Sequence, residues 1–262
     1  MFFFRKILGK QEPAAAVSGK AGARAYAIGD VHGRLDLLDI LLRRIEADMA
    51  SLDARKTFIV FLGDFIDRGP DSAGVIERLR VYRPASARPV FLAGNHEEVL
   101  LRILQGETGI LPSWLKFGGA ECAQSYGIDP KELRRMDEKA GIRLVQDRVP
   151  PAHREFLEGL ADTFSFGDYL FVHAGIRPGI DLEEQNLSDL RWIREPFLSE
   201  QKAHGFMVVH GHTIVDEVDE RPNRIGIDTG AYQTGRLTAL VVEDDRRRYI
   251  VAEAADNDAE RG

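Results

Sequence analysis

Cysteine is almost absent from this sequence, since Cys122 is the only one in 262 residues. A single cysteine cannot form an intramolecular disulfide, which fits a reducing compartment, and we expect a cytoplasmic protein. No stretch approaches the roughly 18 consecutive apolar residues that a membrane-spanning helix requires, so no membrane span is expected. Long basic runs are missing too, and 35 Lys and Arg against 42 Asp and Glu give a net charge of -7. Nucleic acid is therefore not an expected partner.

The remaining composition is that of an ordinary globular protein, with 44% hydrophobic and 29% charged residues. Residues 1–23 combine a Phe-rich start with a stretch of Pro, Ala and Gly, and we expect a flexible N-terminal segment. A strand or cap on the domain, and a contact with a membrane surface or partner, are the alternatives for it. One domain is expected over 24–254, followed by a polar tail over 255–262.

The first third of the chain repeats a strand, a glycine turn and a helix. Apolar runs at 25–28, 58–62 and 89–92 end in Gly29-Asp30, Gly63-Asp64 and Gly94-Asn95, and apolar residues at helical spacing follow each run. The polar residues lie about 30 residues apart, the length of a βαβ crossover. We therefore predict three parallel strands whose carboxyl ends meet at one edge of a sheet, where open α/β folds place ligands.

The rest of the chain does not repeat this pattern of strand, glycine turn and helix. Residues 105–161 are predicted to form a helical insertion, with helices over 131–139 and 151–160. Strands at 163–166 and 169–172 flank Gly167-Asp168 as a hairpin, and further strands are predicted at 206–209, 224–227, 237–242 and 249–252. We expect this half to be mainly antiparallel. The fold class is thus mixed α/β with two sheets.

Polar side chains that suit metal ions follow five of the apolar runs. They stand in the segments Gly29-Asp30-Val31-His32-Gly33, Gly63-Asp64-Phe65-Ile66-Asp67-Arg68-Gly69, Gly94-Asn95-His96-Glu97, His173-Ala174-Gly175 and His210-Gly211-His212-Thr213. Carboxylate, amide and imidazole ligands without a thiolate favour manganese, iron or zinc. We therefore expect this set of ligands to form a dinuclear metal centre. By contrast, His153 and His204 lie in charged, helix-like segments and are expected at the surface.

The ordered set of motifs resembles the phosphoprotein phosphatases among the calcineurin-like metallophosphoesterases, in their compact bacterial and phage form. The resemblance runs from Tyr26 to Gly230. It implies two mixed β-sheets packed as a sandwich, flanked by helices, and two divalent ions. We expect manganese, with iron or zinc as alternatives.

The same resemblance implies the metal ligands. The first ion would be held by Asp30, His32 and Asp64, and the second by Asp64, Asn95, His173 and His212. A shared ligand such as Asp64 is what two ions about 3.5–4 Å apart need, and a hydroxide between them would attack phosphorus without a covalent intermediate. Residues 210 and 212 of one strand point to the same face, so spacing does not separate His210 from His212. The family's Gly-His-Thr element falls on 211–213 and favours His212.

Further roles follow from the resemblance as well. His96 would protonate the leaving oxygen, with Asp67 orienting it. Arg68 corresponds to the first phosphate-binding arginine, because a guanidinium offers two parallel donors to a phosphoryl group. Arg194 is our choice for the second, against Arg191 and Arg177. Eukaryotic relatives carry a tyrosine in a late loop over the site. The corresponding stretch 226–231 here has none, and Tyr232 lies nearby without a clear alignment.

These features predict a metal-dependent serine/threonine protein phosphatase, with phosphotyrosine as a further candidate substrate. The alternative is hydrolysis of diadenosine tetraphosphate or another nucleotide. Glu97, where the nucleotide branch usually has Asp, favours the protein phosphatase branch. A non-catalytic scaffold is a third interpretation, and the intact set of ligands argues against it. Expected partners are a phosphorylated protein or peptide, or a small phosphoester, while the sequence does not indicate an oligomeric state.

Overall fold

The computed structural model describes residues 17–255, which form two five-stranded sheets. The predicted features of residues 1–16 and 256–262 lie outside the described residues. The strands of the first sheet, in spatial order, are β10 (Arg246–Glu253), β9 (Arg236–Glu243), β1 (Ala23–Ile28), β2 (Lys56–Phe61) and β3 (Ala87–Phe91). Those of the second are β4 (Thr163–Phe166), β5 (Tyr169–Val172), β6 (Met207–His210), β8 (Arg224–Gly226) and β7 (Asp219–Glu220).

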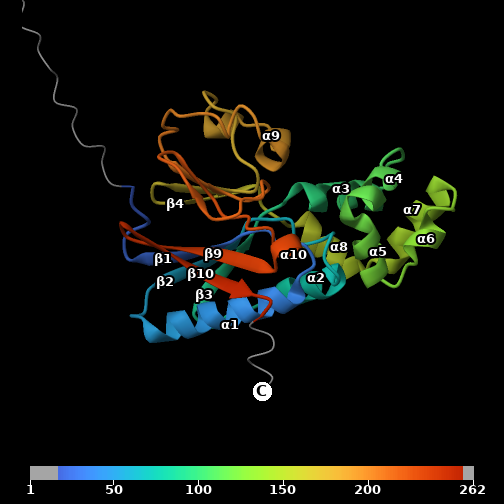
Figure 1. Cartoon of the computed structure of the whole chain (residues 1–262), viewed down its shortest axis with the longest axis horizontal. Coiled ribbons are helices and arrows are strands. Elements are labelled where there is room, and N and C mark those ends of the chain that lie inside the picture. The colour runs from blue at the N-terminus through green and yellow to red at the C-terminus, as the bar shows by residue number, and fades with distance from the viewer. Residues whose placement is uncertain (1–16, 256–262) are drawn as a thin grey trace, which may run out of the picture.

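The two sheets pack face to face, with helices on both outer sides (Figure 1). Helix α1 (Leu35–Ser51) covers the first sheet and α9 (Leu187–Trp192) covers the second. Three apolar clusters of buried residues correspond to these layers: helices against the first sheet, sheet against sheet, and the second sheet against the segment that includes α9. The predicted sandwich of two mixed sheets flanked by helices is confirmed.

Strand β1 shows how the sequence produces this layering. Side chains alternate between the two faces of a strand. Tyr26 and Ile28 point into the cluster under α1, whereas Ala23, Ala25 and Ala27 point into the cluster between the sheets. Because both faces are covered, the strand is buried throughout, as expected for the middle of a sandwich.

Strand direction agrees with prediction in the first half, and the second half is mainly antiparallel with two parallel pairs. Strands β1, β2 and β3 are parallel neighbours, as predicted. The hairpin of β4 and β5 is antiparallel, but β5, β6 and β8 are parallel to one another. Strands β9 and β10 return to the first sheet beside β1. Four of the six pairings made by strands β4 to β10 are antiparallel, so the expectation of a mainly antiparallel second half is confirmed. The two parallel pairs, β5–β6 and β6–β8, arise from crossover connections, which the strand spacing alone did not reveal.

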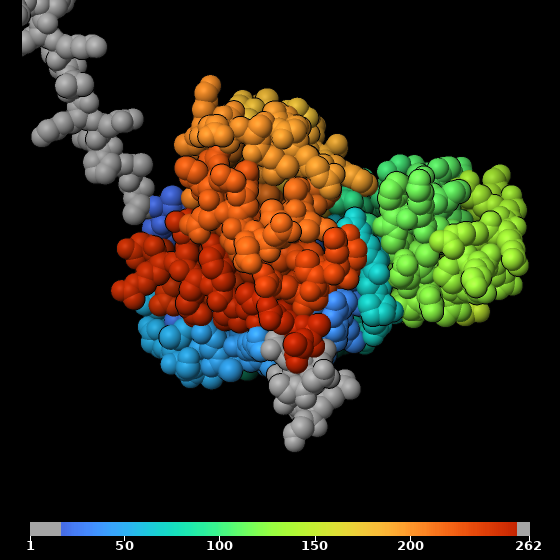
Figure 2. Space-filling model, in the orientation of Figure 1, coloured from blue at the N-terminus to red at the C-terminus, as the bar shows by residue number. Residues whose placement is uncertain are grey.

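The segment between β3 and β4 forms a helical lobe that projects to one side of the sandwich (green in Figures 1 and 2). Its helices are α3 (Asn95–Leu104), α4 (Leu111–Trp114), η1 (Leu115–Gly119), α5 (Ala120–Ser125), α6 (Pro130–Leu133), α7 (Glu138–Arg148) and α8 (Pro151–Glu158). Along the chain, α2 (Ser72–Arg80) joins β2 to β3, η2 (Leu182–Glu184) precedes α9, and α10 (Ala231–Thr234) precedes β9. The helix predicted over 131–139 is broken, because Asp137 caps a new helix by accepting a hydrogen bond from the Ala140 amide.

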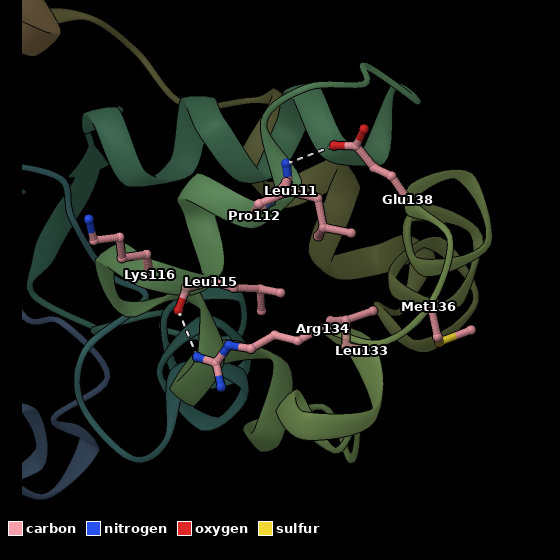
Figure 3. A pocket seen from close by; sticks show the side chains of 8 residues that line it. All are labelled: Leu111, Pro112, Leu115, Lys116, Leu133, Arg134, Met136 and Glu138. Carbon is pink, nitrogen blue, oxygen red and sulfur yellow. Dashed lines mark hydrogen bonds between the residues drawn. The ribbon is translucent and has the colours of Figure 1, made fainter.

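The lobe contains a cavity of its own on the outer side of α4. Its volume is about 510 Å³, and Leu111, Leu115 and Leu133 line it together with polar side chains (Figure 3). Glu138 reaches the amide of Leu111 across one wall, and Arg134 reaches the carbonyl of Leu115 across another. These bonds connect α4 and η1 to the outer helices.

The start of the domain lies slightly before its predicted boundary. Strand β1 begins at Ala23, and Gly19 donates a backbone hydrogen bond to the carbonyl of Asp244 at 2.7 Å. The Asp168 amide likewise donates to Ser18. Within residues 17–255, no helix has both the length and the apolar character that crossing a lipid bilayer demands.

Candidate active site

The predicted site residues come together where loops from the two sheets meet. Asp30 and Asp64 follow β1 and β2, and Asn95 opens α3 just after β3. His173 follows β5 and His212 follows β6 in the second sheet. All six predicted metal ligands, including His32, are buried. The site therefore lies at the carboxyl ends of the strands, as the motif spacing predicts.

Asp64 stands at the centre of this cluster. Its Oδ2 atom lies 3.5 Å from Nε2 of His32, 3.4 Å from Nε2 of His173 and 3.9 Å from Nε2 of His96. The Oδ1 atom of Asn95 lies 3.1 Å from Nε2 of His173 and 2.8 Å from Nδ1 of His212. Asp64 thus adjoins two groups of donor atoms, one with His32 and His96 and one with His173 and His212.

The residues fit a pair of divalent ions. In each group the ligand atoms lie within 4.8 Å of one another. Oδ1 of Asp30 and Nε2 of His212 are buried without a hydrogen-bond partner among the described residues, a costly arrangement that a bound cation would relieve. Asp30 belongs to neither compact group, but its Oδ2 accepts a hydrogen bond from the His212 amide at 3.0 Å. Oxygen and nitrogen donors of this kind suit manganese, iron or zinc.

Backbone carbonyls orient two of the imidazoles. Nδ1 of His32 donates to the carbonyl of Ile66 at 2.8 Å, and Nδ1 of His173 donates to that of Leu62 at 2.9 Å. Each ring therefore presents its Nε2 lone pair to Asp64, the arrangement usual for metal-binding histidines. Burial lowers the pKa of His32 to about 3 and that of His212 to about 3. Both rings are consequently neutral at physiological pH, the form that binds a metal.

Glu97 organises the loop that carries Asp64. Its carboxylate accepts hydrogen bonds from the amides of Asp64 at 2.8 Å, Phe65 at 2.8 Å, Ile66 at 3.3 Å and Gly94 at 2.9 Å. Burial, with Asp64 nearby, raises the pKa of Glu97 to about 7. The sequence marked this residue only as an indicator of substrate branch, and its structural role was missed.

The backbone of the site is unusual. Among residues 17–255, six residues other than glycine have positive φ, and five of them are His32, Asp64, Asp67, Arg68 and His212. This left-handed conformation is uncommon outside glycine and collects at functional sites. Gly94 permits it at Asp64, because a Cβ atom on Gly94 would lie 2.4 Å from the Asp64 amide nitrogen.

A second chain of contacts runs from His96 into the helical lobe. Nδ1 of His96 donates to Oδ2 of Asp67 at 2.6 Å, and Nε1 of Trp114 donates to both carboxylate oxygens of Asp67 at 3.1 Å. Burial acts to lower the pKa of His96, but the carboxylates of Asp64 and Asp67 outweigh it and raise the pKa to about 9. Sequence reasoning did not find Trp114, whose local pattern is that of an apolar helix residue.

A cavity of about 540 Å³ opens beside this chain of contacts. Its walls include Arg68, Asn95, His96, Trp114 and His212, with the exposed aromatics Phe117 and Trp192 and the arginines Arg102 and Arg194. The Arg68 guanidinium lies 3.2 Å from Nε2 of His96 and donates to the Tyr232 hydroxyl at 3.2 Å. Tyr232, left unaligned by the sequence, thus belongs to the site. An anionic group in this cavity would meet both Arg68 and Arg194.

The competing arginines are engaged elsewhere. Arg191 pairs with Asp162 at 2.7 Å and with Glu98 at 3.3 Å, and Arg177 pairs with Asp189 at 2.6 Å. Arg194 lines the cavity, and its guanidinium donates to the carbonyl of His212 at 3.4 Å. The structure thus brings Arg194, and not the other two, into the cavity beside Arg68.

The remaining histidines lie apart from the donor groups. His210 is buried, and its ring packs edge-on against Phe197 at 5.1 Å, so His212 is the one of the pair that reaches Asp64. His153 was expected at the surface but is 7% exposed, since it turns inward from α8 to bond the Tyr126 hydroxyl at 2.9 Å. His204 is half-buried in a loop and stacks on Phe197 at 5.9 Å, so a helical surface position was wrong for it too.

Comparison with known proteins places this geometry in a family context. Residues 23–241 match the family described as calcineurin-like phosphoesterase. The chain is 27% identical to bis(5'-nucleosyl)-tetraphosphatase PrpE [asymmetrical] of Anoxybacillus flavithermus, covering 81% of this chain and 88% of that protein. It is 28% identical to serine/threonine-protein phosphatase 2 of Escherichia coli, covering 81% and 90%. A solved structure provisionally named a diadenosine tetraphosphatase shares the fold, with a TM-score of 0.62, 21% identity and coverage of 90% and 96%.

Proposed function

The chain belongs to the calcineurin-like phosphoesterases, and on this premise we propose that it is a metal-dependent serine/threonine protein phosphatase. Membership of the family makes it a hydrolase of phosphoesters. The observation that carries the proposal is the cluster around Asp64, where two groups of buried ligand atoms share one carboxylate. The hydrogen bond of His96 to Asp67 beside the cavity supports the choice of substrate, for the reason given below.

We propose that Asp30, His32 and Asp64 hold the first divalent ion. Asp64, Asn95, His173 and His212 would hold the second. Manganese is the first metal to test, with iron and zinc as alternatives. When bound, the ions would supply Lewis-acid activation of water and of the phosphoryl oxygens.

The chain's own side chains would bind the phosphate and manage the proton. Arg68 and Arg194 offer guanidinium groups to the phosphoryl oxygens from the walls of the cavity. His96 would deliver the proton that the leaving oxygen requires, and Asp67 keeps the ring oriented through Nδ1 at 2.6 Å.

A positioned general acid favours an alkyl phosphate as substrate. Serine and threonine leave as very basic alkoxides and need a proton, whereas a nucleotide leaves as a weakly basic phosphate and needs little protonation. A buried histidine held by a dedicated carboxylate is therefore better matched to phosphoserine or phosphothreonine. A protein or peptide would present such a side chain to the cavity.

Hydrolysis of a dinucleoside tetraphosphate is the second candidate. The exposed rings of Phe117 and Trp192 line the cavity together with three arginines, and such surfaces can stack a base beside a chain of phosphates. The relatives named bis(5'-nucleosyl)-tetraphosphatase are as similar to this chain as the named protein phosphatase.

One activity panel separates the two candidates. Metal-free protein is reconstituted with manganese, and kcat/KM is measured for phosphoserine, phosphothreonine and phosphotyrosine peptides and for diadenosine tetraphosphate. We expect hydrolysis to depend on added metal and to favour the phosphoserine and phosphothreonine peptides. A preference for diadenosine tetraphosphate would support the second candidate function instead of the first. Hydrolysis that does not depend on added metal would contradict both candidate functions.

Substitution of Arg68 tests phosphate binding. Arg68→Ala and Arg68→Lys are both expected to lower kcat/KM for p-nitrophenyl phosphate by about tenfold or more, because lysine keeps the charge but loses the two parallel donors. Arg177→Lys is the matched control, since Arg177 pairs with Asp189 and lies outside the cavity. Full activity of Arg68→Lys would show that Arg68 contributes only its charge.

A further inference from the structure

Trp114 connects the helical lobe to the carboxylate that holds the predicted proton donor, and we propose that Trp114 is a positioning residue for the Asp67–His96 pair. This inference rests on the proposed function, because it concerns the proton that His96 would deliver. Trp114 would act through Asp67 and need not touch the substrate's reacting atoms.

The contact between Trp114 and Asp67 is specific. The indole Nε1–H lies 3.1 Å from each oxygen of the Asp67 carboxylate, within a hydrogen-bonding range, and Trp114 is only 4% exposed. The Ser72 hydroxyl accepts the Asp67 amide hydrogen at 2.9 Å, so the backbone of Asp67 is anchored separately from its carboxylate. His96 and Trp114 both donate to this carboxylate, and the buried Cys122 side chain also contacts it. Removing the indole donor would take away the hydrogen bonds that Trp114 makes to both carboxylate oxygens.

The surroundings of Trp114 leave its ring little freedom. A Cβ atom on Gly119 would lie 2.2 Å from the indole, so glycine is needed for the close approach of η1 to the ring. Gly118 has φ of +113°, and its carbonyl accepts the Arg68 amide hydrogen at 2.9 Å. The same short segment therefore contacts both Asp67 and Arg68. The lobe is thus built to hold the donor and the phosphate-binding arginine in one arrangement.

If Trp114 positions the acid, its loss should affect some substrates more than others, whereas a general loss of fold stability should affect all substrates alike. A misplaced acid slows reactions that need protonation of the leaving group, but barely affects those that do not. Trp114→Phe keeps an aromatic ring at this position but removes the N–H donor with part of the indole. We expect it to lower kcat/KM for phenyl phosphate about tenfold, with p-nitrophenyl phosphate changed less than about twofold and the metal content unchanged.

Leu111→Ala is the matched structural control. Leu111 begins the same helix, α4, and lines the outer cavity of the lobe (Figure 3). Leu111→Ala should loosen α4 without removing a contact to the Asp67 carboxylate. The ratio of phenyl phosphate to p-nitrophenyl phosphate hydrolysis should therefore stay at the wild-type value. If Leu111→Ala reproduces the discrimination of Trp114→Phe, the effect comes from a loosened lobe and the proposal is wrong.

The hydrogen bond itself can be observed without activity. The chain has two tryptophans, so its zinc-loaded form gives two indole N–H signals in a proton–nitrogen NMR spectrum, and Trp192→Phe assigns them. We expect Asp67→Asn to shift the Trp114 signal and to leave that of Trp192, which donates to Glu98, in place.

The outcomes separate this inference from the proposed function. An unshifted Trp114 signal, or equal slowing of both aryl phosphates in Trp114→Phe, would overturn the positioning role while the wild-type enzyme remains a phosphatase. A wild-type protein that hydrolyses neither aryl phosphate with manganese or zinc would contradict the proposed function, and the role of Trp114 with it.

Discussion

Asp64→Asn is expected to reduce the bound metal to well below two ions per chain and to abolish most phosphoester hydrolysis. Asp64 is the carboxylate shared by the two groups of ligand atoms, so its neutralisation weakens both sites, whereas loss of any other ligand weakens one. An amide oxygen is also a poorer ligand for a divalent cation than a carboxylate. Elemental analysis of the purified variant measures the metal, and p-nitrophenyl phosphate hydrolysis measures the consequence.

The control for Asp64→Asn is an Asp→Asn substitution far from the metal ligands. Asp147 is exposed on α7 in the helical lobe, so Asp147→Asn changes the charge by the same amount and should retain both the metal and the activity. Circular dichroism and thermal unfolding of Asp64→Asn establish that the fold persists. Two ions per chain with normal turnover in Asp64→Asn would show that Asp64 does not bridge the two sites.

His96→Asn should separate substrates by their leaving groups. Expelling a serine-like alkoxide needs a proton, and general acid catalysis typically contributes about 10²–10⁴-fold, whereas p-nitrophenolate leaves with little help. We therefore expect hydrolysis of a phosphoserine peptide to fall by about 100-fold or more, and that of p-nitrophenyl phosphate to fall much less. Asp67→Asn should follow the same trend more mildly, because it disturbs the orientation of the ring without removing the acid.

Two other outcomes would assign His96 a different role. Equal loss of both activities with the metal retained would place it in phosphate binding. Loss of metal would show that His96 is a ligand. Its ligand atom lies within 4.8 Å of those of His32 and Asp64, and metal-binding histidines also donate their second ring nitrogen to carboxylates. Metal analysis of the variant is therefore measured together with its kinetics.

Much of the fold follows from patterns within a few residues. Each of the first three strands is an apolar run closed by glycine and a polar residue, and the crossover length makes them parallel neighbours. Asp30, Asp64 and Asn95 reach one edge of the sheet for that reason alone. The direction of β5, β6 and β8 did not follow, because strand direction depends on how the connections cross the sheet and not on the composition of the strands.

The sequence by itself determined that this is a two-sheet α/β chain with oxygen and nitrogen ligands at the ends of its strands. Only the tertiary structure decided which side chains hold that cluster in place. Trp114 reaches Asp67 across 47 residues, Glu97 reaches back to the Asp64 loop across 33, and Arg191 and Arg177 are withdrawn into ion pairs. These contacts depend on how the lobe and the two sheets pack together. Local patterns determine where a strand or helix lies, but side chains far apart in sequence meet only once the chain has folded.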